Sequence, residues 1–428
     1  GWVLGKYTGL GGESSVLGFP TSDEVAVPGG VSQSFQGGMV FSSAATGAHE
    51  VHGWVLDKWT AMGGVSGALG FPTSDEVRTA DGVYNTFVGG AVFSTPSTGA
   101  HEVHGWIGAR WLALGAGSAA VGFPVSDELP VGDGVGVYNQ FSNGVVVSSP
   151  STGAHDVRGA LAVKWSALGG AGSFLGYPTA DQRSAPGGGQ VAAFSGGSVY
   201  WSSGTGAFEV HGWIRDRWLA NGGPGGGLGY PTSDEQPAPG GVGVFQTFAN
   251  GLVFSSPSTG AREVRGLIED EYTALGGLAS SVGVPVTDEL TMPDGFGRAS
   301  VFSSGAAIYY SPASGAWQVR GWIRGTWSAT NAEAGFLGYP LGDEESAGVP
   351  GAVLQRFQGG RVYSSGATGA REVHGSILAR YLQLGGPASS LGLPVSNEYR
   401  SGNVARSDFQ RGSITCNLTT GAITVTTS

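Results

Sequence analysis

Cysteine, charged residues and long hydrophobic runs are all scarce in this sequence. Cys416 is the only cysteine among 428 residues, which excludes an intramolecular disulfide framework and leaves a small strand residue as its expected role. Charged residues make up 12% of the chain, against roughly 25% in an average globular protein. No apolar stretch approaches the roughly twenty residues of a membrane-crossing helix, so we expect no membrane span.

Clustered positive charge is missing as well. The 21 Lys and Arg residues are outnumbered by 32 Asp and Glu residues, the net charge is −11, and no basic run occurs. Because a phosphate backbone is held by a cationic surface, we expect no nucleic-acid partner. The sequence begins at Gly1, so we expect an export signal or another N-terminal segment to have been removed.

Glycine, by contrast, is abundant, and it accompanies an internal repeat. The chain has 80 glycines, and 40% of its residues are hydrophobic, which is enough for a buried core. Eight copies of a unit of about 53 residues fill the chain and leave no separate stretch for a catalytic domain. We place them at 1–52, 53–104, 105–158, 159–211, 212–265, 266–320, 321–374 and 375–428, the last being atypical.

Each copy predicts one short helix followed by a β-hairpin. In the second copy Val55, Trp59 and Met62 lie on one face of a helix, and Gly63 supplies its left-handed cap. Residues 83–93 predict a hairpin. One copy is too small to bury its own apolar face, so neighbouring copies must share a core. The predicted fold class is an α+β tandem repeat, arranged either as a closed, propeller-like ring or as a solenoid.

Two aromatic positions of the helix differ in what they tolerate. One is aromatic in every copy and is predicted to be buried. It holds Tyr7, Trp59, Trp111, Trp165, Trp218, Tyr272, Trp327 and Tyr381. The other accepts Ala and Ser, so its tryptophans are predicted to be at least partly exposed, either for contact with a ligand or to fill a groove between copies. It holds Trp2, Trp54, Trp106, Ala160, Trp213, Leu267, Trp322 and Ser376.

An acid and a base flank a valine just before each helix. Because side chains alternate along a strand, the two flanking residues are expected on the same face. The pairs are Glu50/His52, Glu102/His104, Asp156/Arg158, Glu209/His211, Glu263/Arg265, Gln318/Arg320 and Glu372/His374, and the last copy has Thr424/Thr426. Acid, base and tryptophan would form a polar and aromatic cluster suited to a sugar; the alternative is an exposed ion pair without a role.

A recurring Asp-Glu dipeptide, such as Asp127-Glu128, follows the helix of most copies. We expect the Asp to accept hydrogen bonds from turn amides and the Glu to meet a neighbouring Lys or Arg such as Lys58. Calcium binding is the less favoured alternative, because the alternating oxygen ligands of calcium loops are missing.

The segment Leu17-Gly18-Phe19-Pro20, with its later copies at Leu69–Pro72 and Leu228–Pro231, resembles the LGFP repeat family. The Gly-Trp-Ile helix start and the Gly-Ala-His-Glu-Val-His segment match it too, so the resemblance covers all eight copies. It implies an exported actinobacterial protein. In that family the repeats often accompany mycoloyltransferase or amidase domains and are thought to attach them to arabinogalactan in the cell wall.

Catalytic motifs are missing from the sequence. His49-Glu50-Val51-His52 lacks the spacing and the helix of a zinc protease motif, and no phosphate loop or nucleophile elbow with a plausible partner set occurs. We therefore expect no enzyme activity, no metal and no cofactor.

The resulting hypothesis is a secreted, cell-wall or cell-surface protein that binds an arabinogalactan-type polysaccharide through several weak sites. Its predicted glycan-binding residues are Glu50, His52, Trp54, Glu102, His104, Trp106, Glu209, His211, Trp213, Arg320 and Trp322. Two alternatives stay open. One is a structural protein that assembles with itself into a filament or layer through the uncharged strand around Val425, and the other is the wall-targeting region of a larger hydrolase or mycoloyltransferase.

Overall fold

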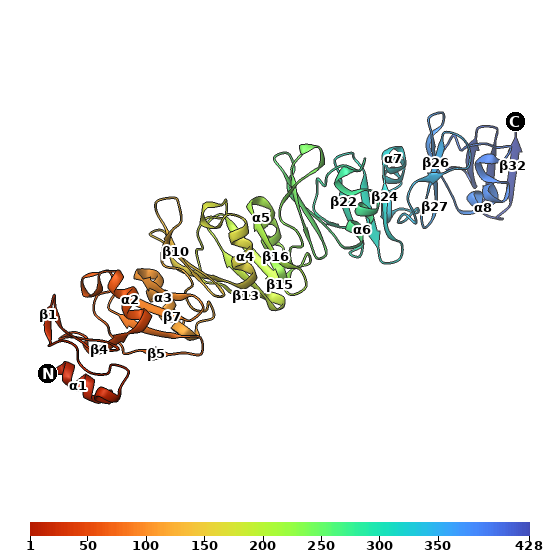
Figure 1. Cartoon of the computed structure of the whole chain (residues 1–428). Helices are drawn as coiled ribbons and strands as arrows, with labels where there is room; N and C mark the ends of the chain where they lie inside the picture. The colour runs from red at the N-terminus through yellow and green to blue at the C-terminus, as the bar shows by residue number, and fades with distance from the viewer. The chain divides into compact units, whose positions relative to one another are not determined.

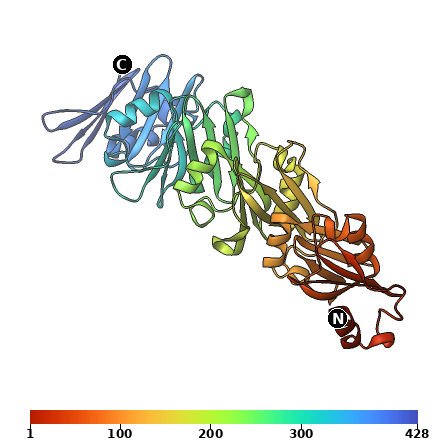
Figure 2. The ribbon, with the colours of Figure 1, turned by 90° about the vertical axis from the view of Figure 1, so that its left-hand side faces the viewer.

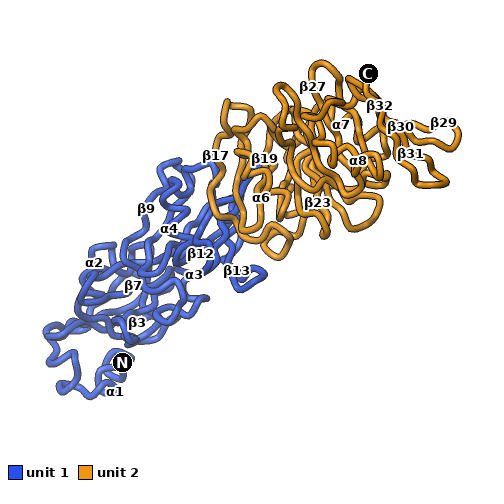
Figure 3. The backbone as a smooth tube through the Cα atoms, turned by 90° about the vertical axis from the view of Figure 1, so that its right-hand side faces the viewer, with its two compact units in different colours: residues 1–212 blue, residues 213–428 orange.

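The computed structural model describes all 428 residues and contains two compact units, residues 1–212 and residues 213–428 (Figure 3). The eight sequence copies appear as eight modules, each with one α-helix and one four-stranded antiparallel sheet. The chain is therefore an α+β tandem repeat, as predicted. The helices are α1 (Trp2–Gly9), α2 (Gly53–Ala61), α3 (Gly105–Ala113), α4 (Gly159–Ala167), α5 (Gly212–Ala220), α6 (Gly266–Ala274), α7 (Gly321–Ala329) and α8 (Gly375–Gln383).

The first unit contains four sheets, whose strands follow one another in chain order (Figure 1). Sheet 1 has β1 (Val25–Val27), β2 (Gly30–Ser34), β3 (Gly38–Ser43) and β4 (Gly47–His52). Sheet 2 has β5 (Val77–Arg78), β6 (Val83–Phe87), β7 (Gly90–Thr95) and β8 (Gly99–His104). Sheet 3 has β9 (Leu129–Pro130), β10 (Val137–Phe141), β11 (Gly144–Ser149) and β12 (Gly153–Arg158). Sheet 4 has β13 (Arg183–Ala185), β14 (Gly189–Ala193), β15 (Gly197–Ser202) and β16 (Gly206–His211).

The second unit contains the other four sheets, built in the same way. Sheet 5 has β17 (Gln236–Pro237), β18 (Val244–Phe248), β19 (Gly251–Ser256) and β20 (Gly260–Arg265). Sheet 6 has β21 (Leu290–Thr291), β22 (Arg298–Val301), β23 (Ala307–Ser311) and β24 (Gly315–Val319). Sheet 7 has β25 (Glu345–Ser346), β26 (Ala352–Arg356), β27 (Gly360–Ser365) and β28 (Gly369–His374). Sheet 8 has β29 (Tyr399–Ser401), β30 (Val404–Phe409), β31 (Gly412–Asn417) and β32 (Ile423–Thr427).

The predicted helix and hairpin of a module are confirmed, and one strand was missed. Helix α2 ends at Ala61 and is followed by Gly63 in the left-handed region, with φ 97°. The hairpin pairs Val83 with Ser94 and Phe87 with Gly90. The missed strand, β5 in module 2, has two residues, too few to show an alternating pattern in sequence.

Within each unit, successive sheets are joined by the helix between them. Helix α2 packs on β3 and β4 of the preceding sheet and on β7 and β8 of its own, an alternation that Figures 1 and 2 follow along the first unit. One core cluster accordingly contains Phe41 and Val51 from sheet 1, Val55 and Trp59 from α2, and Val92 from sheet 2. Neighbouring modules therefore share their cores, as the repeat length predicted.

The aromatic position predicted to be buried is buried in modules 2 to 8, and Tyr7 of module 1 is half-buried. Its polar tip explains why it is always Trp or Tyr. Trp59 Nε1 donates to the carbonyl oxygen of Gly70 at 3.0 Å, and Tyr272 Oη donates to that of Gly283 at 2.7 Å. The same bond recurs from Tyr7, Trp111, Trp165, Trp218, Trp327 and Tyr381.

The Leu-Gly-Phe-Pro segment joins the helix to the sheet. Leu69 is buried. Gly70 has φ 66°, a backbone conformation that would be strained in a residue with a side chain. In this conformation the carbonyl oxygen of Gly70 accepts a hydrogen bond from the indole of Trp59. Pro72 forms a β-bridge with Phe87, and the bridge needs no N–H from the proline because Thr73 and Val88 donate on either side. The motif is thus a structural corner of each module.

Candidate functional site

The acids predicted to bind a glycan lie inside the protein. Glu50, Glu102 and Glu209 are only 4%, 4% and 2% exposed, and their equivalents in the other modules that have an acid or Gln are 0–6% exposed. These acids are buried and hydrogen-bonded, so neither the exposed ion pair nor the sugar-contacting acid that the sequence suggested describes them. They are buried because the turn that follows the next Leu-Gly-Phe-Pro corner packs over this end of the strand.

The contacts in module 2 show what these acids do. Glu102 Oε1 accepts the backbone N–H of Glu128 in the next module at 2.9 Å, and Oε2 lies 2.7 Å from His104 Nδ1. In return, Asp127 Oδ1 accepts the backbone N–H of Glu102 at 3.3 Å, and Oδ2 pairs with Lys58. We call this reciprocal set the junction clasp. It ties the last strand and the helix of one module to the loop of the next.

The clasp corrects part of the roles predicted for the Asp-Glu dipeptide. The Asp, not the Glu, meets Lys58, and it accepts a strand amide of the preceding module rather than a turn amide. The predicted pairing of the Glu with a neighbouring Arg is confirmed: Glu289 lies 3.3 Å from Arg265, and Glu344 lies 3.2 Å from Arg320. No group of three or more His, Cys, Asp or Glu side chains in the structure is placed to hold a metal ion.

Burial and pairing shift several pKa values in the clasps. Burial raises the pKa of Glu50, against the hydrogen bond from the Glu76 backbone N–H. For Asp75, burial alone would raise the pKa, but the hydrogen bonds from Lys6 and the Glu50 backbone N–H, together with the charges of Lys6 and His49, outweigh burial, and the pKa is lowered. The hydrogen bond to Glu372 raises the pKa of His374.

The bases are more accessible than the acids. The side chains of His52, His104 and His211 are 13%, 30% and 27% exposed, and that of Arg320 is 47% exposed. Each base thus presents part of its ring or guanidinium at the surface while its other side contacts the clasp.

The tryptophans predicted to be exposed are exposed. Trp2, Trp54, Trp106, Trp213 and Trp322 are 54–61% exposed, far above the level of any core residue. Trp54 does not contact Glu50 in a common cavity. It lines a groove with Arg78, Asp81 and Ser94 of its own module. The groove therefore brings the indole together with the strand edge, and Glu50 does not line it.

The equivalent groove of module 4 is lined by Ala160, Arg158, Ser184 and Trp201. Ala160 stands in the place of Trp54, and Trp201 in the place of Ser94. The helix has lost its indole here, and the strand supplies one. We call the groove at this pair of helix and strand positions the rim groove; modules 2 and 4 show it.

The exchange recurs in module 6, where Leu267 replaces the helix tryptophan and Tyr310 replaces the strand serine. Seven of the eight modules thus have one aromatic ring among the two positions, and Ser376 and Cys416 leave module 8 with none. The helix and strand residues are Trp2/Ser42, Trp54/Ser94, Trp106/Ser148, Ala160/Trp201, Trp213/Ser255, Leu267/Tyr310, Trp322/Ser364 and Ser376/Cys416. Sequence reasoning missed Trp201 and Tyr310, although an aromatic residue at a position that is Ser in most other copies was a visible signal.

Comparison with known families gives one match. The LGFP repeat family model matches residues 17–67, 69–118, 121–173, 175–226, 228–280, 282–335 and 337–389. Each matched segment starts at a Leu-Gly-Phe-Pro corner and ends after the next helix. The family's repeat unit therefore has the same length as the module described above, but its boundaries fall at the corner instead of at the helix. No protein of curated function matches the chain. No helix has the length and apolar content needed to cross a membrane.

Solved structures give only remote likeness. The extracellular domain of BT4673 from B. thetaiotaomicron is 9% identical with a TM-score of 0.12, and the match covers 96% of this chain and 62% of that one. The AfRom2 CNH domain is 9% identical with a TM-score of 0.14, over 70% of this chain and 84% of that one. PorZ, a surface component of the type-IX secretion system of Porphyromonas gingivalis, is 8% identical with a TM-score of 0.14, and the match covers 96% of this chain and 45% of PorZ.

Proposed function

This chain belongs to the LGFP repeat family, and we propose that it is a non-catalytic protein of the cell wall or cell surface that binds an arabinogalactan-type envelope polysaccharide at its rim grooves. The observation that carries the proposal is the single aromatic ring found in seven modules at this pair of positions, supplied by the helix in five modules and by the strand in two. In modules 2 and 4 the pair lines a groove. A partly exposed ring can stack on the C–H face of a sugar.

The bases support the same site. His52 lies 3.3 Å from Glu76, which in turn lies 3.4 Å from Arg78 at the edge of the groove of Trp54. Donors at this edge suit sugar hydroxyls. In the proposal the tryptophans and the exposed bases contact the glycan, and Glu50, Glu102 and Glu209 hold the clasps that position them.

Binding to insoluble wall arabinogalactan tests the proposal. We expect the protein to be retained, and a variant with Trp54, Trp106, Trp213 and Trp322 changed to Ala to lose most of that retention. The matched control changes Val88, Val135 and Phe296 to Ala, which are 68%, 60% and 73% exposed and lie outside the rim grooves described above. Absence of retention by the unaltered protein, or equal loss in the control, would overturn the proposal.

The arrangement of the modules is part of the proposal. We favour a solenoid over a closed ring, because a helix joins each sheet to the next within both units and an open series suits a long polymer. Small-angle X-ray scattering measures the maximum dimension, which a closed ring of eight modules would keep much shorter.

Self-assembly is the second candidate, and β32 favours it. Strand β32 pairs with β31, and Thr424 and Thr426 stand where the other modules have an acid or Gln and a base, so the strand is uncharged. Sedimentation should then show association that Thr424→Lys, which places a charge on this strand, abolishes; a monomer at all concentrations would remove this candidate.

A further inference from the structure

Module 8 has no aromatic ring at the helix or the strand position, where Ser376 and Cys416 stand. Module 4 shows which other residue reaches a rim groove when the helix residue is small. Its groove has a volume of ≈ 640 Å³ and is lined by Ala160 and Trp201, and also by Ala120, which comes just before the Val-Gly-Phe-Pro segment of module 3. We call the residue just before this segment of each module the corner residue. It is a third position from which a side chain can face the groove of the next module.

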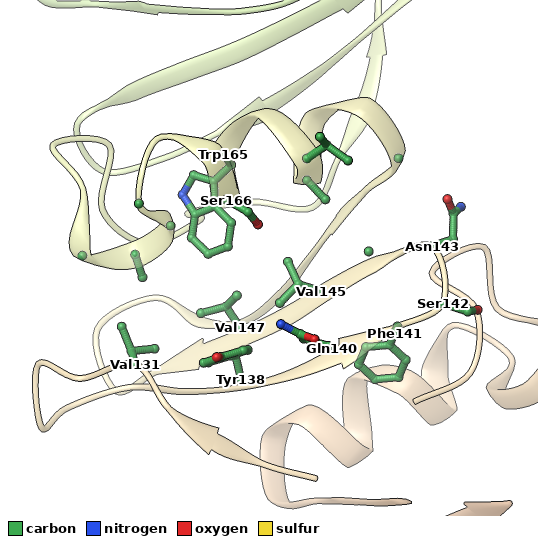
Figure 4. Close-up of a pocket in the computed structure, with 18 residues that line it drawn as sticks. Val131, Tyr138, Gln140, Phe141, Ser142, Asn143, Val145, Val147, Trp165 and Ser166 are labelled. Atoms are coloured by element: carbon green, nitrogen blue, oxygen red, sulfur yellow. The ribbon is translucent and has the colours of Figure 1, made fainter. Parts of the chain in front are cut away.

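The hairpin turn of module 3 holds the corner residue in place. Asn143 Nδ2 donates to the carbonyl oxygen of Ala120 at 2.8 Å, and Asn143 also lines the groove. Figure 4 shows Asn143 on that turn, beside a second hollow of ≈ 730 Å³ that shares Asn143 and Gly159 with the groove. In module 2, where the helix residue is Trp54, the corner residue Val16 does not line the groove. A small helix residue therefore opens the groove toward the corner residue.

The corner residue before module 8 is aromatic. Ser376 on the helix of module 8 is small, as Ala160 is in module 4, and the corner residue that precedes it is Phe336, which is 50% exposed. Only one other corner residue is aromatic. The eight corner residues are Val16, Ala68, Ala120, Phe174, Gly227, Ser281, Phe336 and Ser390. The ring that is missing from the helix and the strand of module 8 is thus present at the third position.

Phe336 lies on the base of its junction clasp. The centroids of the Phe336 and His374 rings are 4.2 Å apart, and their planes are inclined at 37°. Phe174 and His211 make the equivalent contact, with centroids 4.6 Å apart and planes at 46°. Since both aromatic corner residues contact the base, this contact is a property of the position.

The clasp fixes the support on which Phe336 rests. His374 Nδ1 lies 2.8 Å from Glu372 Oε2, and Nε2 lies 3.3 Å from Glu398 Oε1, so both nitrogens of the imidazole have a carboxylate partner. The ring of Phe336 therefore lies on a positioned group while half of its surface stays exposed. An aromatic ring that is already held in place loses less conformational freedom when it binds a ligand.

A hydrogen-bond donor accompanies the ring. Arg400 is exposed and pairs with Ala405, which in turn pairs with Cys416. In module 2 the same register leads from Arg78 at the edge of the groove to Ser94. Arg400 therefore stands in the place of Arg78, and its guanidinium can donate to hydroxyl groups.

We propose that the junction of modules 7 and 8 is a further sugar-binding site, in which Phe336 stacks on a sugar ring of the envelope polysaccharide and Arg400 donates hydrogen bonds to its hydroxyl groups. His374 is a positioning residue in this site, because both of its ring nitrogens face the clasp. The proposal rests on the proposed function, since it adds an eighth ring to the series of seven and places that ring on the corner instead of on the helix or the strand.

Retention of the whole chain on insoluble wall arabinogalactan tests this site. Phe336→Ala is expected to weaken retention by about two- to fivefold, as the loss of one ring from the series. Adding Ser376→Trp to Phe336→Ala returns a ring to the helix position and should restore most of the retention. The matched control is Phe19→Ala, which removes a phenylalanine that is 59% exposed and whose counterparts do not line the grooves of modules 2 and 4. The control should be retained as well as the unaltered protein.

The outcomes separate this site from the proposed function. If Phe336→Ala is retained as well as the unaltered protein while the four-tryptophan variant is lost, the site is overturned and the proposed function stands. If Phe336→Ala weakens retention but Ser376→Trp does not restore it, Phe336 only supports His374 and the stacking role is overturned. Absence of retention by the unaltered protein overturns both.

Discussion

At the scale of the residue, the ring that anchors each helix has to be a hydrogen-bond donor as well as large. Trp59 and Tyr272 both donate to the left-handed Gly of the following corner, and Phe, with the same bulk but no donor, occurs at none of the eight positions. An unpaired carbonyl in a buried corner costs about 1–3 kcal/mol. The sequence showed that the position is aromatic, but the reason for excluding Phe came from the structure.

Tyr272→Phe is therefore expected to lower the free energy of unfolding by about 1–2 kcal/mol, because the carbonyl of Gly283 loses its donor. Urea denaturation of the whole chain measures it. Tyr272→Trp keeps a donor and should lose less; a Phe variant as stable as the native protein would contradict this account.

A second residue-scale feature is a reversed charge. At the helix position where Lys6 and Lys58 meet the Asp of a clasp, module 6 has Glu271, beside Asp343. Burial, together with the hydrogen bond and charge of Asp343, raises the pKa of Glu271 to about 7. The folded state thus binds this proton more tightly than the unfolded chain, so stability is lost as the pH rises through about 7.

Glu271→Lys should recreate the ion pair of the other junctions. We expect a gain of about 1 kcal/mol at pH 8, seen as a melting temperature a few degrees higher, and a smaller gain at pH 5, where Glu271 is protonated. Glu271→Gln, which only removes the repulsion, should give the pH-dependent part alone. A gain that is the same at both pH values would show that repulsion between Glu271 and Asp343 is not its source.

At the scale of the element, the clasp makes the last strand of one sheet and the loop of the next module a single unit. The pairing of Glu102 with His104 followed from strand alternation, as predicted. The burial of Glu102 did not follow, because the loop with Asp127 and Glu128 that covers it comes about 25 residues later in the chain. The alternation of side chains predicts on which face of the strand a residue lies, but it does not predict which segment packs on that face.

Glu102→Ala should lower stability by about 2–3 kcal/mol, since the N–H of Glu128 and the ring of His104 both lose a charged partner. Thermal melts measure the change. Glu102→Gln keeps an acceptor oxygen and should lose less, and Trp106→Ala, at an exposed position of the same junction, should cost less than about 1 kcal/mol. If Glu102→Ala were as stable as the native protein, the clasp would have no energetic role.

At the scale of the whole molecule, the repeat places an aromatic ring at one of two equivalent positions in seven of the eight modules. Under the proposed function each rim groove binds the polymer weakly. Because one polymer chain occupies several grooves at once, the overall affinity greatly exceeds the affinity of a single groove. The rings of Trp201 and Tyr310 keep this series going in modules whose helix lacks tryptophan.

Retention on arabinogalactan should therefore fall steeply with the number of rings removed. We expect Trp106→Ala to weaken retention only by about two- to fivefold, and the four-tryptophan variant by about a hundredfold or more. Binding isotherms at equal protein concentration measure both. Complete loss in the single variant would point to one dominant site instead of a series.

The sequence by itself determined the eight modules, the helix and hairpin of each, the buried and the exposed aromatic positions and the pairing of acid with base. All of these depend on contacts close in the chain or on comparing equivalent positions of the copies. Tertiary structure alone decided which of these side chains meet across modules. It buried Glu102, placed Trp54 in a groove that Glu50 does not line, and placed Trp201 of module 4 in the equivalent groove, where the helix has no indole. Those outcomes depend on packing between residues far apart in the chain, which no local pattern records.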